Sequence, residues 1–431
     1  MYERLENKFK ITHPQNENAT YSSLMNYSDD LEKPLQRWYR YKEGFSMELV
    51  ENLIRRYNKN PNGLILDPFL GSGTTIIAAN SLGLAGAGFE VNPFSYFLSK
   101  CKLRNYDENC IRELETKSQY VLERAMEETR EYELPKLSIA SNVFDQEVEA
   151  HFMTVKELIS ELQYEYKETQ ELLLLGWLSS IEELSNYRKA GNGLKKRRYV
   201  RPRVKTKKDV YVVLSDAYKR MIEDVRAVGI SFDARIFNES CLNMRDVIDD
   251  QSVSGIIFSP PYANCFDYTE IYKLELWFGG FVKEYSDLRE LRTISLRSHL
   301  NGKMEIPEDT TLTPTVESLL GELSTKELWD QRIPDMLTLY FRDMFEVLRQ
   351  AYGVLEDNGF CSIVVGNSSY GGVVFPTDLL LAEYAEKLGF IVDKIEVDRY
   401  IIPSSQQYEM TKQYKKLLRE SVVCLVKKKT S

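Results

Sequence analysis

The stretch Gly63-Leu64-Ile65-Leu66-Asp67-Pro68-Phe69-Leu70-Gly71-Ser72-Gly73-Thr74-Thr75 decides the fold of this 431-residue chain. Its apolar start is typical of a buried strand, and a helical pattern follows from about Thr74 to Leu82. Glycine at 71 and 73 allows a tight turn between the two, because no side chain is present where the backbone approaches a ligand. A second expected strand, 85–90, follows, and a helix begins near Pro93. This strand-helix-strand unit predicts a parallel sheet.

The rest of the chain divides into a helical part and a return to strands. From about residue 103 to 233 the apolar spacing predicts helices, and strands are then expected at 234–237, 255–258, 360–365, 391–397 and 421–426. The fold class is therefore α/β, with one doubly wound, mostly parallel sheet. We expect the sheet domain to comprise 1–102 and 234–431, interrupted by a helical insertion at 103–233 and by a second excursion at about 284–330.

The glycine turn has the features of a cofactor loop. It lacks the lysine of a phosphate-binding P-loop, and the third glycine of a dinucleotide fingerprint is missing. Glu90 ends the next expected strand, at a separation where an acidic residue reaches ribose hydroxyls. These observations favour a phosphate-free, ribose-bearing cofactor, although a purely structural strand-turn-helix remains the alternative.

The second motif, Ser259-Pro260-Pro261-Tyr262, follows another apolar strand. Consecutive prolines fix the backbone and leave their carbonyls as acceptors. Ser259 and the Pro260 carbonyl together can accept both N–H groups of an exocyclic base amine, which turns the nitrogen lone pair toward an electrophilic methyl group. We expect Tyr262 to stack on a flipped-out base, at roughly 1–3 kcal/mol. A simple proline turn is the alternative, and residues 264–270 are a candidate for shaping the base pocket.

With these motifs the chain resembles the S-adenosylmethionine-dependent DNA amino-methyltransferases, over roughly 36–102 and 234–427. The glycine loop looks like their cofactor motif, and Ser259-Pro260-Pro261-Tyr262 looks like their catalytic motif. The order of the motifs is similar to the α-type, and serine in first place is more typical of the cytosine-N4 branch. The resemblance implies a Rossmann-like methyltransferase fold, S-adenosyl-L-methionine as cofactor and double-stranded DNA as partner.

The same resemblance assigns site residues. The catalytic set is Ser259, Pro260, Pro261 and Tyr262. The cofactor set is Phe45, Ser46, Asp67, Pro68, Phe69, Gly71, Ser72, Gly73, Thr74, Thr75, Glu90 and Ser240. Asn238-Glu239-Ser240-Cys241 stands where relatives often carry the aspartate that meets the cofactor's adenine, and which of the four makes that contact is open.

A basic segment at 187–208 reverses the charge of a chain whose formal net charge is −9. Its glycines and Pro202 argue against a continuous helix, so we expect an exposed loop that contacts DNA phosphates; a merely solvated loop is the alternative. The residues assigned to DNA are Arg188, Lys189, Lys195, Lys196, Arg197, Arg198, Arg201 and Arg203.

Composition limits the remaining possibilities. A content of 43% hydrophobic and 28% charged residues is that of a globular protein. The N-terminus lacks a signal-peptide pattern, no apolar run reaches membrane-spanning length, and the six cysteines have no metal-ligand spacing. We therefore expect a cytoplasmic enzyme without a metal.

Three functions remain open. The leading hypothesis is cytosine-N4 methylation of DNA in a restriction-modification or phage-defence system, with a cognate nuclease as a candidate partner. The others are methylation of adenine N6 or of an RNA base, and a catalytically silent DNA-binding subunit of the same fold.

Overall fold

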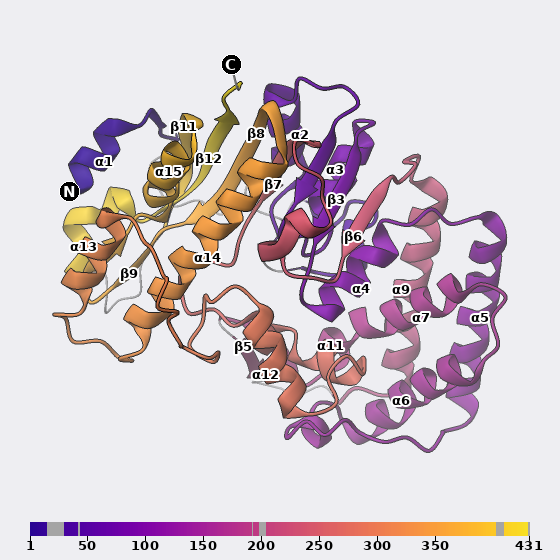
Figure 1. The fold of residues 1–431 in the computed structure, drawn as a ribbon. Helices are drawn as coiled ribbons and strands as arrows, with labels where there is room; N and C mark the ends of the chain where they lie inside the picture. The colour runs from indigo at the N-terminus through magenta and orange to yellow at the C-terminus, as the bar shows by residue number, and fades with distance from the viewer. Residues whose placement is uncertain (15–29, 42–43, 192, 198–203, 402–408, 430–431) are drawn as a thin grey trace.

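A single large sheet organises the molecule (Figure 1). The computed structural model describes residues 1–14, 30–41, 44–191, 193–197, 204–401 and 409–429. In spatial order the strands of the sheet are β1 (Ile11–Thr12), β11 (Phe390–Tyr400), β12 (Arg419–Lys427), β8 (Leu355–Gly366), β7 (Val253–Phe258), β2 (Leu64–Asp67), β3 (Ala85–Phe89) and β6 (Ala234–Phe237). From β8 to β6 all neighbours are parallel, whereas β12 is antiparallel to both β8 and β11. The predicted doubly wound, mostly parallel sheet is confirmed.

Helices cover both faces of the sheet because side chains alternate along each strand. Ile65 and Ile257 face α2 (Met47–Tyr57) and α3 (Thr74–Ser81), whereas Leu66 and Ile256 share a core with α14 (Ile333–Val354) and α15 (Thr377–Leu388). The predicted strands and the helix predicted from about Thr74 to Leu82 agree with the structure. Smaller elements on the sheet domain are α1 (Tyr2–Lys8), η2 (Gln36–Trp38), η4 (Cys241–Asp246), η5 (Lys412–Leu417) and the hairpin β9 (Ser368–Tyr370) with β10 (Val373–Phe375).

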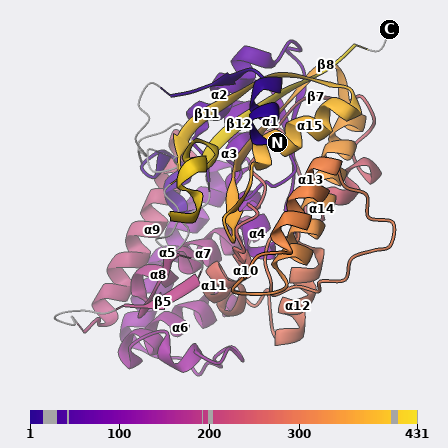
Figure 2. The ribbon, with the colours of Figure 1, turned by 90° about the vertical axis from the view of Figure 1, so that its left-hand side faces the viewer.

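The insertion forms a helical body beyond the β6 edge of the sheet (Figures 1 and 2). After α4 (Pro93–Lys102) it contains α5 (Glu108–Glu127), η3 (Ala140–Asn142), α6 (Gln146–Glu161), α7 (Lys167–Ser179), α8 (Ile181–Leu184) and α9 (Lys207–Ala227). Its core is continuous with Trp38, Tyr39 and α4 and with α11 (Lys273–Phe278), so the insertion packs against the sheet domain over a shared hydrophobic core.

The basic segment is only partly the expected loop. Residues Tyr187–Ala190 (β4) and Gly193–Lys196 (β5) pair as an antiparallel hairpin, and Gly191 turns the chain with a φ of +60°. The loop prediction was wrong for this part, because β4 pairs with β5 and its Lys189 side chain reaches Glu275 of α11. Residues 198–203 lie outside the described residues.

The excursion at about 284–330 contains α12 (Tyr285–Ile294) and α13 (Pro314–Leu323). It follows the short helix α10 (Tyr268–Ile271) and α11, and Figure 1 shows α12 between the helical body and α14. All six cysteines are unpaired, and five are buried. Among the described residues, no helix is long and apolar enough to cross a membrane.

The path of the chain creates a crevice at one edge of the sheet. From β2 it runs through β3 and β6 on one side, and it then returns to β7 on the other side of β2. Ligands of open α/β sheets bind where the strand order reverses in this way, outside the carboxyl ends of the strands.

Candidate active site

The carboxyl ends of β2 and β7 open into one pocket. Asp67 ends β2 and Ser259 follows β7, and both side chains line this pocket although the sequence separates them by nearly two hundred positions. The pocket encloses about 1110 Å³ including solvent at its mouth. Because residues of both motifs line it, the glycine turn and the proline motif share one opening.

Most of the predicted cofactor residues meet there. Nine of the twelve line the pocket: Phe45, Asp67, Pro68, Phe69, Gly71, Ser72, Thr74, Glu90 and Ser240. The other three lie behind it. The Ser46 hydroxyl accepts the Leu49 N–H and caps α2, Gly73 is the N-cap residue of α3, and the Thr75 hydroxyl donates to Asp67 over 2.6 Å.

The glycine turn is fixed by a carboxylate. The Gly71 N–H donates to Glu90 Oε2 and the Asn92 N–H donates to Oε1, each over 2.8 Å. Gly71 has a φ of +53°, and a Cβ there would come within 3.1 Å of the Tyr41 ring. A side chain at position 71 would therefore strain the turn and press on Tyr41.

Two carboxyl groups in the pocket have raised pKa values. Burial raises the pKa of Asp67 to about 7, against the opposing hydrogen bonds from Thr75 and the Phe69 N–H. Burial likewise raises the pKa of Glu90 to about 7, while the N–H groups of Asn92 and Gly71 pull it down. Both groups are thus poised to ionise when a cation enters.

The segment after β6 supplies one rim of the pocket. Glu239, Ser240 and Cys241 line it, and the Ser240 hydroxyl accepts the Leu242 N–H. The Asn238 amide instead donates to the Glu90 carbonyl over 2.7 Å. Asn238, one of the four candidates for contact with the adenine amine, therefore links the end of β6 to the end of β3.

The proline motif divides between the pocket and the core. Ser259 and Pro261 line the pocket, whereas Pro260 is buried. The Tyr262 ring packs on the backbone of Gly366, where a Cβ would come within 2.8 Å of the ring. Burial raises the pKa of Tyr262, and a hydrogen bond from Ser259 opposes that shift. Stacking of Tyr262 on a base stays a prediction, because its ring is not part of the pocket lining.

The wall opposite the glycine turn comes from residues with little or no sequence signal. Asp267, Tyr268 and Thr269 belong to the segment that we considered for the base pocket. The remainder come from the end of α12 and the turn after it, where the ordinary amphipathic pattern of the sequence does not indicate a site. They are Leu291, Ile294, Ser295, Leu296, Ser298 and His299.

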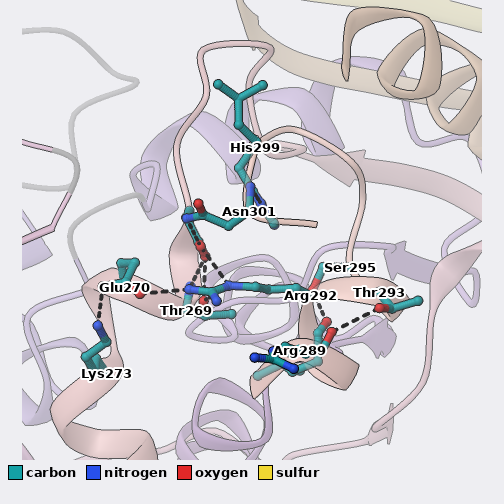
Figure 3. Close-up of polar contacts among 12 residues, drawn as sticks. Thr269, Glu270, Lys273, Arg289, Arg292, Thr293, Ser295, His299 and Asn301 are labelled. Atoms are coloured by element: carbon teal, nitrogen blue, oxygen red, sulfur yellow. Dashed lines mark hydrogen bonds and ion pairs between the residues drawn. The ribbon is translucent and has the colours of Figure 1, made fainter. Parts of the chain in front are cut away.

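An arginine ties this wall together. Figure 3 shows Arg292 extending from α12 between Thr269 and Glu270, with Asn301 above it. Arg292 Nε donates to Asp267 Oδ2 over 2.9 Å, and its Nη2 donates to Glu270 over 2.7 Å. The Asn301 amide donates to the same Asp267 oxygen over 2.8 Å. These contacts join the segment after the proline motif to α12 and its following turn.

The basic hairpin lies next to this wall, since β5 lies against α10, whose Tyr268 and Thr269 line the pocket. Of the predicted DNA-binding residues, Arg188, Lys195 and Lys196 are exposed. Arg197 donates to the carbonyls of Tyr187 and Glu182. Arg198, Arg201 and Arg203 lie outside the described residues.

The position of Lys189 contradicts its predicted role in DNA binding. Its side chain is 4% exposed, and its ammonium pairs with Glu275 over 2.5 Å and contacts the Tyr39 hydroxyl. It is directed into the shared core and not toward DNA, because alternate residues of β4 point to opposite faces. Among the described residues, no group of three or more His, Cys, Asp or Glu side chains is arranged to hold a metal ion.

Comparisons with known proteins agree with this geometry. A family model described as DNA methylase matches residues 3–100. The type II methyltransferase M.BsoBI of Geobacillus stearothermophilus is 27% identical, over 97% of this chain and 91% of that protein. M.AvaI of Nostoc is 28% identical over 87% and 83%, and M.MvaI of Kocuria varians is 19% identical over 88% and 86%. The chain is similar to the N4/N6 DNA amino-methyltransferases, over residues 3–100 in the family model and over most of its length in M.BsoBI and M.AvaI. The enzyme is a DNA methyltransferase, and S-adenosyl-L-methionine is its cofactor.

The pocket of this methyltransferase fits that cofactor chemically. Among the described residues that line it, the acidic side chains are Asp67, Glu90, Glu239 and Asp267, and no lysine or arginine is present. Such a lining suits a ligand with a positive charge and hydroxyl groups, and it disfavours a phosphate. Each oxygen of Glu90 keeps a lone pair for a ribose hydroxyl beyond the N–H that it already accepts.

Lys189→Met tests the corrected role of the hairpin lysine. Removing the cation leaves the Glu275 carboxylate buried and unpaired, so we expect the free energy of unfolding to fall by about 3–5 kcal/mol. Lys196→Met, at an exposed position of the same hairpin, should change it by less than about 0.5 kcal/mol. The measurement is urea denaturation. The double variant Lys189→Met/Glu275→Leu should recover most of the loss, and equal stability of the two single variants would contradict the assignment.

Proposed function

We propose that this enzyme transfers a methyl group to the exocyclic N4 amine of a flipped-out cytosine in double-stranded DNA. It would serve as the modification enzyme of a type II restriction-modification or phage-defence system, with a cognate nuclease as partner. The observation that carries the proposal is the shared pocket of Ser259 and the glycine turn. The relatives are named type II methyltransferases, and serine at position 259 is the residue typical of the cytosine branch.

In this proposal the pocket has two halves. The glycine turn, Phe45, Glu90 and the 239–241 segment hold S-adenosyl-L-methionine, which supplies an electrophilic methyl group when bound. The half between the proline motif and α12 receives the base. Ser46, Gly73 and Thr75 support the first half indirectly, through the helix cap, the turn and the hydrogen bond to Asp67.

Ser259 is the proposed catalytic residue. Its hydroxyl lines the pocket, and a hydroxyl oxygen can accept an N–H of the amine. The Pro260 carbonyl would accept the second N–H, so that the nitrogen lone pair points along the line of methyl transfer. One amine proton leaves to solvent after the C–N bond has formed, because a serine hydroxyl is too weak a base to keep it.

The insertion, residues 103–233, is the proposed DNA-recognition region, and 1–102 with 234–431 form the catalytic domain. The exposed hairpin cations Arg188, Lys195 and Lys196 lie beside the base half of the pocket through the contact of β5 with α10. Phosphate contacts there would position the duplex while the target base is turned into the pocket.

Ser259→Ala should reduce kcat by about 10²–10³-fold, because it removes one acceptor of the amine in the transition state. Affinity for S-adenosyl-L-methionine, measured by calorimetry, should stay within about twofold. Ser252→Ala, which removes an exposed hydroxyl bonded to the Asp249 carbonyl, is the matched control. A Ser259→Ala enzyme with wild-type turnover would contradict the catalytic role.

The methylated base can be identified directly. The enzyme is incubated with S-adenosyl-L-methionine and mixed-sequence DNA, which is then digested to nucleosides for mass spectrometry and mapped for modified positions. We expect N4-methylcytosine. N6-methyladenine alone would overturn the choice of base, and cofactor binding without any product would indicate a silent subunit.

Affinity for the cofactor should depend on pH. Because the pKa values of Asp67 and Glu90 lie near 7 in the free enzyme, both groups are largely protonated at pH 5.5. A cationic ligand favours their ionised forms, so affinity should rise from pH 5.5 to 7.5, by up to about tenfold per unit for each linked proton. Calorimetry in buffers of different ionisation enthalpy should detect proton release. S-adenosylhomocysteine lacks the sulfonium charge and should show a smaller rise; a flat profile for both ligands argues against this coupling.

Alanine at Arg188, Lys195 and Lys196 should weaken DNA binding for all sequences alike. The slope of log affinity against log salt concentration should fall by about 1 for each phosphate that the variant no longer neutralises. Fluorescence anisotropy from 50 to 200 mM salt measures both quantities. Unchanged affinity and slope would place the DNA surface elsewhere.

A further inference from the structure

Two polar side chains on the base half of the pocket have hydrogen-bonding capacity that the fold does not use. Ser298 and His299 stand in the turn after α12, and both line the pocket. They are 1% and 3% exposed. A buried hydroxyl without a partner is uncommon, so that of Ser298 calls for an explanation.

The Ser298 hydroxyl is the clearest case. Its Oγ is buried without a hydrogen-bond partner, although the backbone N–H of the same residue donates to the Leu296 carbonyl over 2.8 Å. By contrast, the hydroxyl of the neighbouring Ser295 donates to the Leu291 carbonyl of its own helix over 2.7 Å. The turn therefore fixes the Ser298 backbone and leaves its hydroxyl for a ligand in the pocket.

His299 is held as a donor. Its Nδ1 lies 3.3 Å from the Asn301 N–H, and because a backbone N–H can only donate, Nδ1 must be the acceptor. A neutral imidazole then carries its proton on Nε2. Burial lowers the pKa of His299, with the Asp267 charge opposing and the Arg292 charge reinforcing that shift, so the ring is neutral at pH 7.

The position of both residues is set by the contacts of Arg292 and Asn301 described above. Arg292 joins α12 to Asp267 and Glu270, and the Asn301 side chain returns to Asp267 (Figure 3). The turn that carries Ser298 and His299 is therefore anchored on both sides to the segment that follows the proline motif. The hydrogen bonds of Arg292 and Asn301 thus hold the two donors, Ser298 and His299, in position beside the base half of the pocket.

We propose that Ser298 and His299 donate hydrogen bonds to N3 and O2 of the target cytosine and thereby select it against adenine. The inference rests on the proposed function, because it assigns the other end of the base whose amine meets Ser259. It makes Ser298 and His299 specificity-determining residues of the methyl transfer.

The chemistry of the two bases supports this choice. Beside its amine, cytosine presents two successive acceptors, N3 and O2. Adenine presents one acceptor, N1, followed by a C–H group. A pocket with two buried donors matches cytosine, whereas with adenine one donor would stay unpaired, and sites of this kind reject the analogue that lacks the partner atom.

The test uses duplexes that contain the mapped target site. Ser298→Ala and His299→Ala should each lower kcat/KM by about 10-fold to 100-fold. His299→Gln, which keeps an N–H donor, should recover most of that loss. Thr293→Val is the matched control, because the exposed Thr293 hydroxyl donates to the Arg289 carbonyl within α12. Binding of S-adenosyl-L-methionine should stay unchanged in every variant.

A second substrate separates a specific contact from a general weakening of the site. In 3-deazacytosine a C–H group replaces N3, so the wild-type enzyme should lose activity on it. On this substrate, the alanine variant that lacks the donor to N3 should have the same kcat/KM as the wild-type enzyme. The other alanine variant should still show its full loss of kcat/KM, about 10-fold to 100-fold.

Each outcome has one meaning. If the wild-type product is N6-methyladenine, the proposed function itself fails. If the product is N4-methylcytosine but both alanine variants keep wild-type kcat/KM, only this inference is overturned. It is also overturned if the variants lose cofactor affinity in parallel with activity, or if both losses persist in full on 3-deazacytosine.

Discussion

The pairing of β2 with β7 is the constraint on which the active site depends. Ile65 is opposite Gly255 and Leu66 is opposite Ile256, in parallel register. Parallel strands end at the same edge, so this register places the last residue of β2 and the first residue after β7 at one opening. The register leaves little freedom: a Cβ at Gly255 would come within 2.1 Å of the Phe360 ring on the next strand. The placement of the two motifs at one opening therefore follows from packing inside the sheet.

The polar side chains around that opening include buried carboxyl groups with raised pKa values and a hydroxyl without a partner, both of which a ligand can satisfy. Asp67 and Glu90 have raised pKa values because they are buried, and their hydrogen bonds fix the glycine turn. Ionising a buried carboxyl group without a cation is unfavourable, and a positively charged cofactor removes that penalty. In the proposed base half, the Ser298 hydroxyl without a partner and the neutral His299 ring can likewise be satisfied by a bound base. Both halves of the pocket thus have unmet interactions that the reactants complete.

The helical body and the sheet are joined by a buried ion pair as well as by apolar contacts. Lys189 of the hairpin reaches Glu275 beside Tyr39, and this anchors β4 while Arg188 and Lys195 remain at the surface. One strand thus serves the core with one face and presents cations with the other. The sequence did not distinguish the buried lysine from the exposed cations, because strand alternation was not evident in a segment rich in glycine and lysine.

The sequence by itself determined the sheet, its helices and the identity of the two motifs. Local rules were sufficient there: glycine for a positive φ, apolar runs for buried strands, and prolines for a fixed acceptor. Nine of twelve cofactor assignments line the pocket for the same reason, since they stand within a few residues of a strand end or a helix start. The tertiary structure alone decided which lysine of the basic segment is buried. It alone brought the turn after α12 to the pocket, because these outcomes depend on contacts between residues far apart in the chain.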